Sequence, residues 1–304
     1  MTKAPYDSCV YLSSIPNPQR PSRKREVLLS FHTGVSKVTG CTYLQDRPDV
    51  LSQRLAVILG AVHKNPQTEH LRLRYNVIQK QEADRFKTMY IDSSCFKYVD
   101  KFDRYLRYSI DGVFYDKHQY ANKNSNSRKW EMIKKDLQLD KKPWKKDGGY
   151  ILLCMQRDGG WSMKNINPID WAANKIAEIK QRTTLPIYVR PHPGKLIDVK
   201  PLLGLGVTFT DSKSKPLLHD LQGAKVALFY NSSAAVAAAL EGVPLFIDDD
   251  SCPAAAVANR NIDDILSPKM FPRSQWLFDL CAAHWNDEES RQGLIYQKFS
   301  QYLR

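Results

Sequence analysis

Residue types that bind phosphate follow several short apolar runs in the second half of the chain. Each run ends directly before cationic, amide or hydroxyl side chains, as in YVRPHPGK (188–195). In parallel α/β sheets, ligands bind beyond the carboxyl ends of the strands, so these positions are candidates for one shared site. The candidates are Gln156, Arg157, Arg190, His192, Asn231, Ser232 and Ser233.

The chemistry that these side chains offer is recognition of an anion. The guanidinium groups of Arg157 and Arg190 suit a diphosphate, and His192, held between two prolines, could donate to a phosphate or a sugar. Ser232 and Ser233 add hydroxyl donors where a helix is expected to begin, which favours anions further. Structural roles are the alternatives: Ser232 as a cap of the helix, and His192 as a histidine whose hydrogen bonds are satisfied within the protein.

The glycines of the chain follow neither the GxGxxG nor the GxxxxGK[ST] spacing. Ordinary dinucleotide and P-loop nucleotide sites are therefore disfavoured. An anionic small ligand held by side chains is the simpler interpretation.

The second half alternates predicted strands and helices, which indicates a parallel sheet with right-handed crossovers. The continuous apolar runs are typical of strands that are buried on both faces. The predicted strands are 150–156, 186–190, 207–211, 225–230 and 243–249, and the predicted helices are 168–181, 215–224 and 232–242.

The first half also alternates, and it predicts a second α/β domain. Strands are expected at 26–31, 71–78 and within 104–116, and helices at 51–64 and 82–90. The segment 140–149 is rich in proline, glycine and charge, so we expect a hinge there.

The predicted architecture is therefore α/β, with two Rossmann-like domains facing a cleft. We expect an acceptor-binding domain over 1–145 and a nucleotide-sugar-binding domain over 146–285. A C-terminal helix over 286–304 is expected to cross back and pack on the first domain. No internal repeat or low-complexity tract interrupts this pattern.

Composition points to a globular protein with a polyanionic partner. The 304 residues are 42% hydrophobic and 25% charged, and the net charge is +13, with lysines and arginines in clusters. Such a charge favours nucleic acid through phosphate neutralisation, although a solubilising surface is the alternative. No transmembrane span or signal peptide is expected, and the six scattered cysteines indicate reduced thiols in a cytoplasmic protein.

The motif Arg190-Pro191-His192-Pro193, with Asn231-Ser232-Ser233 later in the chain, resembles the nucleotide-sugar-binding half of GT-B glycosyltransferases with HP and SS motifs. The strings LRYSIDG (106–112) and LCMQRDGGWSM (153–163) are similar to bacteriophage glycosyltransferases that modify 5-hydroxymethylpyrimidines in DNA. The likeness covers roughly residues 104–250.

This resemblance implies transfer of a sugar from a UDP-sugar to 5-hydroxymethylcytosine in double-stranded DNA, with flipping of the target base. It also implies that Glu241 contacts the donor ribose, although a solvated helix end is the alternative, and Gly34 is added to the donor set. Asp111 is the predicted general base, with His32 as its runner-up. The candidates for DNA contact are Lys37, Arg72, Arg74 and Tyr108.

Two further readings stay open beside the DNA-modifying enzyme. One is a GT-B transferase or epimerase that acts on a saccharide, and the other is a nucleic-acid-binding protein that has lost catalysis. A monomer without a resident cofactor is expected, in the host cytoplasm if the protein is viral. The carboxylates of Asp248, Asp249 and Asp250 point in different directions along a loop, so no metal site is assigned and Mg²⁺ stays optional.

Overall fold

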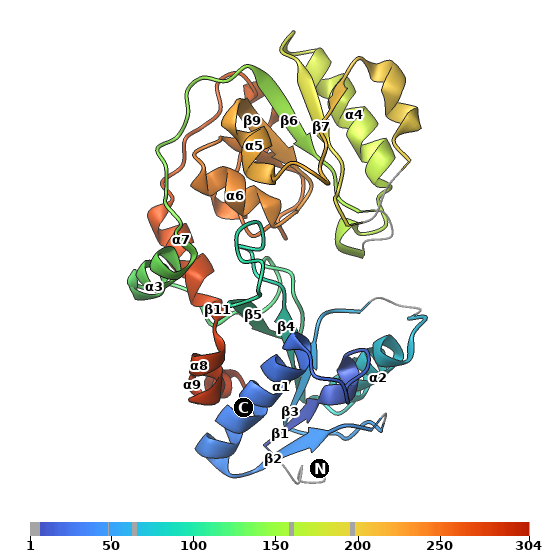
Figure 1. The fold of residues 1–304 in the computed structure, drawn as a ribbon, viewed down its shortest axis with the longest axis vertical. Helices are drawn as coiled ribbons and strands as arrows, with labels where there is room; N and C mark the ends of the chain where they lie inside the picture. Colours follow the sequence, from blue (N-terminus) through green and yellow to red (C-terminus); the bar gives the residue numbers. More distant parts are fainter. Residues whose placement is uncertain (1–6, 48, 63–65, 158–160, 195–197, 304) are drawn as a thin grey trace. The chain divides into compact units, whose positions relative to one another are not determined.

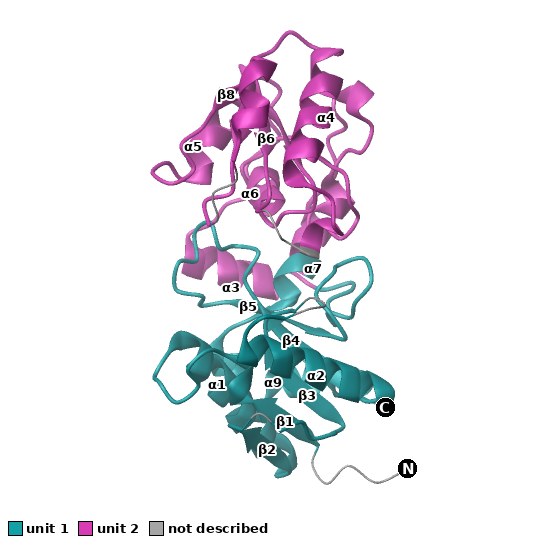
Figure 2. Ribbon diagram, turned by 90° about the vertical axis from the view of Figure 1, so that its right-hand side faces the viewer, with its two compact units in different colours: residues 1–125, 279–304 teal, residues 126–278 magenta. Residues whose placement is uncertain are grey.

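The chain divides into two compact units in the computed structural model, which describes residues 7–47, 49–62, 66–157, 161–194 and 198–303. Unit 1 comprises residues 1–125 and 279–304, and unit 2 comprises residues 126–278 (Figure 2). The C-terminal residues 279–304 therefore belong to unit 1. Residues 126–145, expected with the first domain, belong to unit 2.

Unit 1 is built on a mixed six-stranded sheet with the order β11-β5-β4-β3-β1-β2 (Figure 1). Its strands are β1 (Ser8–Tyr11), β2 (Thr42–Gln45), β3 (Leu55–Leu59), β4 (Lys87–Asp92), β5 (Leu106–Ile110) and β11 (His284–Trp285). Strands β1 to β4 run parallel, whereas β5 is antiparallel to β4 and β11 is antiparallel to β5. The carboxyl ends of the four parallel strands thus form one edge, and β5 ends at the other.

Helices cover both faces of this sheet. They are α1 (Arg23–Thr39), α2 (Glu69–Ala83), α8 (Asp287–Arg291) and α9 (Leu294–Phe299), with the short 3₁₀ helix η1 (Leu12–Ser14) after β1. Val10 and Val57 pack with α1 and α9 on one face, whereas Cys9 and Ala56 pack with α2 on the other. This alternation along β1 and β3 is the two-residue period of strands that are buried on both faces.

The segment EVLLSF (26–31) is helical, and its prediction as a strand is wrong. Ser22 caps the helix by accepting a hydrogen bond from the backbone N–H of Arg25, and Gly40 ends it in the left-handed conformation. The buried residues Val27, Phe31 and Val35 recur at helical spacing, so packing of one helix face outweighs the local apolar run.

Three other assignments in the first half are also wrong. Residues 71–78 lie inside α2, where Leu73, Val77 and Gln81 share its buried face. Residues 51–64 contain β3 rather than a helix, because the five apolar residues from Leu55 to Leu59 form a parallel strand between β1 and β4. The predicted helix over 82–90 is the end of α2 followed by β4.

Unit 2 is built on a parallel five-stranded sheet with the order β10-β9-β6-β7-β8. Its strands are β6 (Tyr150–Cys154), β7 (Ile187–Arg190), β8 (Thr208–Phe209), β9 (Ala224–Phe229) and β10 (Leu245–Ile247). Its helices are α3 (Arg128–Leu137), α4 (Pro168–Lys180), α5 (Leu217–Gln222), α6 (Ala234–Leu240) and α7 (Ser274–Ala282), of which α7 continues into unit 1. All five strands predicted for the second half, and the helices between them, are confirmed.

The sheet of unit 2 also lies between helical layers. Ile151, Val189 and Val226 pack with α4, while α5 and α6 contact β9 on the sheet. The consecutive buried residues from Ala235 to Leu240 bring α6 against the strands. The six cysteines, all of them among the described residues, form no disulfide. Among the described residues, no helix combines the length and hydropathy needed to cross a membrane.

Candidate functional site

The carboxyl edge of the unit 2 sheet has a topological switch point between β6 and β9. From β6 the chain adds β7 and β8 on one side, and then β9 and β10 on the other. The loops that leave β6 and β9 therefore diverge and leave a crevice between them, which is where α/β sheets of this kind bind ligands. Gln156 and Arg157 follow β6, and Asn231 to Ser233 follow β9.

Hydrogen bonds join these two loops across the crevice. The side-chain oxygen of Gln156 accepts from the backbone N–H of Asn231 at 3.1 Å, and its amide nitrogen donates to the hydroxyl of Ser162 at 3.1 Å. Asn231 donates to the carbonyl of Ser162 and to the hydroxyl of Ser251, each at 2.7 Å. Gln156 and Asn231 are both buried, so they position the loops.

One atom of this network has no hydrogen-bond partner among the described residues. The side-chain oxygen Oδ1 of Asn231 is buried, and Asn231 is only 8% exposed. An unpaired buried acceptor costs about 1–3 kcal/mol. A donor group from a ligand or a water beside Asn231 would remove this cost.

Ser232 and Ser233 lie half-buried at the start of α6, as predicted from the sequence. The hydroxyl of Ser232 accepts from the backbone N–H of Ala234 at 3.2 Å, whereas Ser233 makes no side-chain capping bond. Because α6 has only seven residues, we attribute anion binding at this point to the serine hydroxyls and not to the helix dipole.

Arg157 and His192 bring a cation and an imidazole to the same edge. Arg157 is exposed, and His192 is partly buried with its Nδ1 accepting from the backbone N–H of Gly194 at 3.0 Å. Burial, followed by the charge of Arg157, lowers the pKa of His192, so its imidazole is neutral near pH 7. With Nδ1 accepting, the proton of the neutral ring sits on Nε2, which can donate to a phosphate oxygen.

Arg190 was predicted to bind the donor, but its guanidinium is turned into the protein. It is 7% exposed, pairs with the carboxylate of Asp220 at 2.5 Å and donates to the carbonyl of Lys215 at 2.9 Å. Its charge is therefore compensated inside unit 2, and the prediction of a phosphate contact is corrected to a structural ion pair.

Glu241 does not share the edge of Ser232 and Ser233. It follows the last residue of α6 and pairs with Lys142, so the seven residues of the helix separate it from the serines. At about 1.5 Å of rise per residue, that separation exceeds roughly 10 Å. The position of Glu241 therefore does not favour the predicted contact with the donor ribose.

The carboxylates of Asp248, Asp249 and Asp250 each have their own partners. Asp248 accepts from the indole N–H of Trp171 and pairs with Lys175, and Asp250 pairs with Arg260. Among the described residues, no group of three potential ligands could hold a metal ion.

Asp249 belongs to the network behind the crevice, together with residues that the sequence analysis did not select. Its carboxylate pairs with Lys164 at 2.5 Å and accepts from the backbone N–H of Ser251 at 2.9 Å. Lys164 follows the predicted loop after β6 and belongs to no recognisable motif. Its position beyond the end of a strand was the one feature of the sequence that pointed to a place in this site. Asp158, Gly159 and Gly160, which carried part of the resemblance, lie outside the described residues, as does Lys195.

In unit 1, Asp111 lies at the edge opposite the carboxyl ends of the parallel strands. It follows β5, which is antiparallel to β4, and its carboxylate pairs with Lys87 at 2.7 Å and accepts from the backbone N–H of Thr88 at 3.1 Å. A role as general base stays a prediction, and this placement does not favour it.

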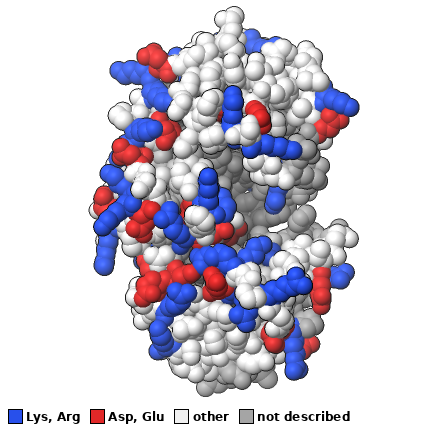
Figure 3. Space-filling model, viewed as in Figure 1, with Lys and Arg blue, Asp and Glu red and all other residues white. Residues whose placement is uncertain are grey.

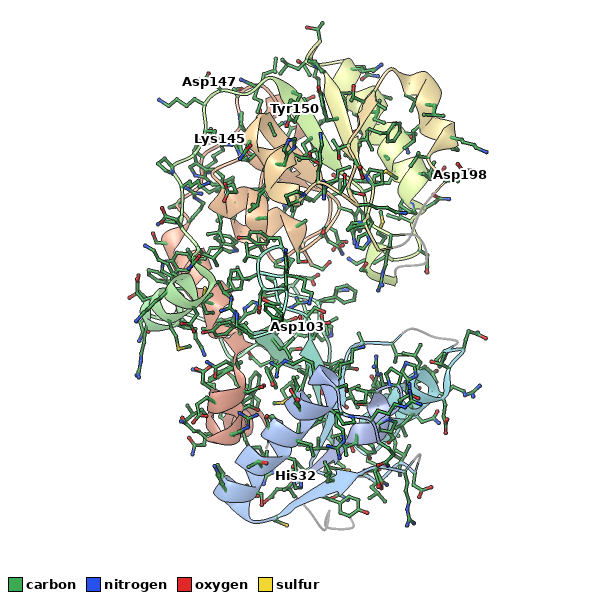
Figure 4. The ribbon with its side chains drawn as sticks, in the orientation of Figure 1. His32, Asp103, Lys145, Asp147, Tyr150 and Asp198 are labelled. Atoms are coloured by element: carbon green, nitrogen blue, oxygen red, sulfur yellow. The ribbon has the colours of Figure 1, made fainter. Side chains whose placement is uncertain are left out.

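His32 and Gly34 lie within α1 and not in a loop after a strand (Figure 4). His32 is nine residues past the first residue of a 17-residue helix, about 13 Å along its axis. Gly34 is buried, and a Cβ placed on it would lie 1.9 Å from the backbone oxygen of Ser290. Gly34 therefore permits close contact of α1 with the C-terminal segment, and a place in the donor site is not supported.

Of the four residues predicted to contact DNA, two are buried and two are exposed. Tyr108 is 1% exposed and stacks with Phe31 in the core, and Arg74 is buried with its Nε donating to the carbonyl of Ser14 at 2.7 Å. Neither is available to DNA, so these two assignments are corrected to structural roles. Lys37 and Arg72 are exposed, on α1 and α2 respectively.

A pocket of about 280 Å³ lies at the carboxyl edge of the unit 1 sheet. Three segments line it: the loop after β1, the residue after β2, and the first turns of α2. The lining residues are Ser13, Ile15, Pro16, Asn17, Pro18, Asp46, Glu69, His70 and Leu73. This pocket was not predicted from the sequence, although the Pro-Asn-Pro turn at 16–18, which follows an apolar run, was a possible signal.

Comparison with known proteins finds matches among solved structures only. The chain is similar to Thermosulfurimonas dismutans KpsC, beta Kdo 2,7 transferase, with 14% identity, a TM-score of 0.50, and coverage of 96% of this chain and 99% of that chain. It is also similar to Thermosulfurimonas dismutans KpsC, beta Kdo 2,4 transferase, with 12% identity, a TM-score of 0.55, and coverage of 92% and 90%. No family model and no curated protein matches.

These likenesses establish the fold of the chain. Each unit is a sheet with helices on both faces, a Rossmann-like arrangement, and the likeness spans both units, so the predicted fold class of two α/β domains is confirmed. The matched structures are named as Kdo transferases, so they give no support to the resemblance to DNA-modifying enzymes.

Proposed function

We propose that the chain is a glycosyltransferase that binds a nucleotide-activated sugar at the carboxyl edge of the unit 2 sheet. The observation that carries this proposal is the hydrogen-bonded link between Gln156 and Asn231 at the switch point between β6 and β9. It joins the two loops that border a nucleotide crevice in folds of this kind. The fold shared along nearly the whole length of two transferases supports the same activity.

Each side chain at this edge has a part in holding the donor. Arg157 neutralises the phosphate charge, and the Nε2–H of neutral His192 donates to a phosphate oxygen. The hydroxyls of Ser232 and Ser233 add further donors. The unpaired Oδ1 of Asn231 accepts from a hydroxyl or amide of the bound nucleotide, or from a water between them.

A saccharide is the acceptor that we favour. Both matched structures are named as Kdo transferases, and they span almost the same length as this chain. A saccharide acceptor is therefore closer to the activity named for these similar structures than a DNA acceptor is. UDP is the first nucleotide to test, because the HP and SS motifs resemble those of nucleotide-sugar sites.

DNA that carries 5-hydroxymethylcytosine is the second candidate acceptor. The net charge of +13 favours it, as do exposed Lys37 and Arg72. Acidic side chains lie among the basic ones on the face drawn in Figure 3, so that face offers no continuous basic surface. An epimerase, or a nucleic-acid-binding protein without catalysis, would share the fold but not produce a transferred sugar.

Titration calorimetry with UDP, CMP, GDP and TDP tests the donor site. We expect one of them to bind, and Arg157→Ala to weaken its affinity about 10- to 100-fold, the loss of a charge-assisted bond of about 1.5–3 kcal/mol. Arg182→Ala is the matched control, because Arg182 pairs with Asp263 on the surface of the same unit. Absence of binding by all four nucleotides, or equal losses in both variants, would contradict the proposal.

Mass analysis of the products separates the acceptors. The protein is incubated with the matching nucleotide sugar and with either methyl glycosides or a hydroxymethylated duplex. A mass gain on a glycoside supports the saccharide acceptor, and a gain on a nucleoside after digestion supports DNA. If a nucleotide binds but neither the glycoside nor the nucleoside gains mass, the chain is a nucleotide-binding protein and the transferase activity is refuted.

A further inference from the structure

The pocket of unit 1 combines groups that recognise sugars. Ser13, Asn17, Asp46 and Glu69 supply hydroxyl, amide and carboxylate groups, which hydrogen-bond to sugar hydroxyls. Apolar surface from Ile15, Leu73 and two prolines lies beside them and suits the C–H face of a pyranose. The volume of about 280 Å³ is close to the lower end of small-molecule sites, roughly 300 Å³.

The position of the pocket in the sheet matches that of a ligand site. The chain runs from β1 through α1 to β2 on one side, and β3 lies on the other side of β1. The loop after β1 and the start of α2, which follows β3, therefore diverge at the switch point of unit 1. Buried Arg74 holds this region together, because it donates to the carbonyls of Ser14 at 2.7 Å and Ala61 at 3.3 Å.

The charge of the pocket disfavours a phosphate backbone. Asp46 and Glu69 are acidic, and the described residues of the lining include no lysine or arginine. The two carboxylates would repel an anion that enters between them, and Arg74 and Lys24 offset part of this repulsion near His70. A neutral or cationic saccharide is the acceptor that fits.

His70 supplies the pocket with a group that can accept a proton. Its surroundings are charged: Glu69 and Arg74 lie on its own helix, Lys24 on α1, and Asp46 after β2. The hydroxyl of Thr68 lies 3.5 Å from its Nε2. Burial lowers the pKa of His70, and the charges of Arg74 and Lys24 lower it further, while Glu69 opposes them. The imidazole is therefore neutral near pH 7, as a general base must be.

We propose that this pocket binds the terminal residue of a saccharide acceptor and that His70 is the general base that takes the proton from its attacking hydroxyl. The proposal rests on the glycosyltransferase function argued above. The acceptor oxygen forms a bond to the anomeric carbon of the donor, and the bond from that carbon to the phosphate oxygen breaks. The electron pair leaves on the nucleotide phosphate, and the hydroxyl proton moves to His70 and then to water.

Saturation-transfer NMR on the full chain tests the binding step. The probes are the methyl glycosides of glucose, galactose, mannose and N-acetylglucosamine. We expect transfer to at least one of them, and at least 10-fold weaker binding in the double variant Asp46→Asn, Glu69→Gln. Asn76→Ala, on the exposed side of α2, is the control and should bind as the unchanged chain does. Binding of no glycoside, or unaltered binding by the double variant, would overturn the proposal.

Kinetics of His70→Gln test the chemical step. With the glycoside that binds, we expect kcat to fall about 10²- to 10⁴-fold, the usual contribution of a general base, with nucleotide affinity unchanged. The acid limb of the pH–rate profile should disappear as well, which a purely structural role would not cause. An unchanged kcat, or a retained acid limb, would remove His70 as the base.

The two proposals fail in different ways. If no nucleotide binds at unit 2, the transferase function itself is refuted. If a nucleotide binds and a sugar is transferred while the pocket variants behave like Asn76→Ala, the donor site stands and only the acceptor pocket is refuted.

Discussion

The carboxyl edges of the two sheets carry opposite chemistry. In unit 2, the edge presents Arg157, His192 and serine hydroxyls over a network of buried amides. In unit 1, the edge presents Asp46, Glu69 and His70 around a small pocket. The first set suits an anion and the second a polyol, although the same kind of sheet builds both edges. This division of charge suits the proposed transfer of a sugar from a nucleotide to the hydroxyl of a neutral saccharide.

The contrast also separates ligand-binding charges from structural ones. Arg190 and Arg74 both lie near a sheet edge, yet both are buried and fully engaged within their units. Arg157 is exposed at the edge of its sheet. A buried cation that is held by groups of its own unit is not available to a ligand. Four predictions test the roles assigned to residues of the two units.

The largest expected effect comes from Asp220→Ala, which leaves the buried guanidinium of Arg190 without its carboxylate. Breaking a buried ion pair on one side typically costs about 3–5 kcal/mol, so urea unfolding should show a loss of that size. Asp263→Ala removes the exposed partner of Arg182 and should cost no more than about 1 kcal/mol. A small loss for Asp220→Ala, together with weaker nucleotide binding, would return Arg190 to the donor site.

Gly34→Ala should destabilise unit 1 without changing nucleotide affinity. The added methyl group would meet the backbone oxygen of Ser290, and overpacking of this kind costs about 1–3 kcal/mol. Gly149→Ala is the control, because a Cβ at Gly149 has no heavy atom within 4 Å. The free energy of unfolding and the nucleotide affinity are measured for both. A selective loss of nucleotide affinity in Gly34→Ala would restore Gly34 to the donor set.

The difference between the units also explains what could be predicted from the sequence. In unit 2, strands such as β6 and β10 are short apolar runs whose residues are buried almost throughout. The strand ends were therefore located, and with them Arg157, His192 and Ser232. In unit 1, the apolar run of α1 is as compact as a strand, and only the cap at Ser22 and the stop at Gly40 distinguish it.

The errors in unit 1 carried over to its candidate site residues. Because residues 26–31 of α1 were predicted as a strand, His32, the next residue, was expected at the end of a strand. Because the antiparallel direction of β5 depends on tertiary pairing, nothing local showed that Asp111 ends at the opposite edge. The pocket around His70 gathers three segments that are distant in sequence, and no spacing rule could assemble them.

Lys164→Met should lower the free energy of unfolding by about 1 kcal/mol near neutral pH, because it removes a partly exposed salt bridge to Asp249. Burial disfavours the charged form of Asp249, but hydrogen bonds from Lys164 and Ser251 outweigh it and lower the pKa of this carboxyl. A lowered pKa contributes stability above the unfolded value, and that stability is lost as the pH falls through the folded one. Unfolding measured from pH 7 down to pH 3 should therefore show a shallower acid slope in Lys164→Met, and an unchanged slope would contradict the pairing.

The smallest expected effect concerns the unit 1 edge. Lys24 lowers the pKa of His70, so Lys24→Gln should raise this pKa toward its ordinary value. A base must be unprotonated, and the acid limb of the pH–rate profile should therefore move to higher pH. Lys37→Gln, at the far end of α1, removes the same charge and should leave the limb in place. Because Lys24 is exposed, the shift should shrink as salt is added. A limb that moves equally in both variants would mean that overall charge, and not the pocket around His70, sets the pH dependence.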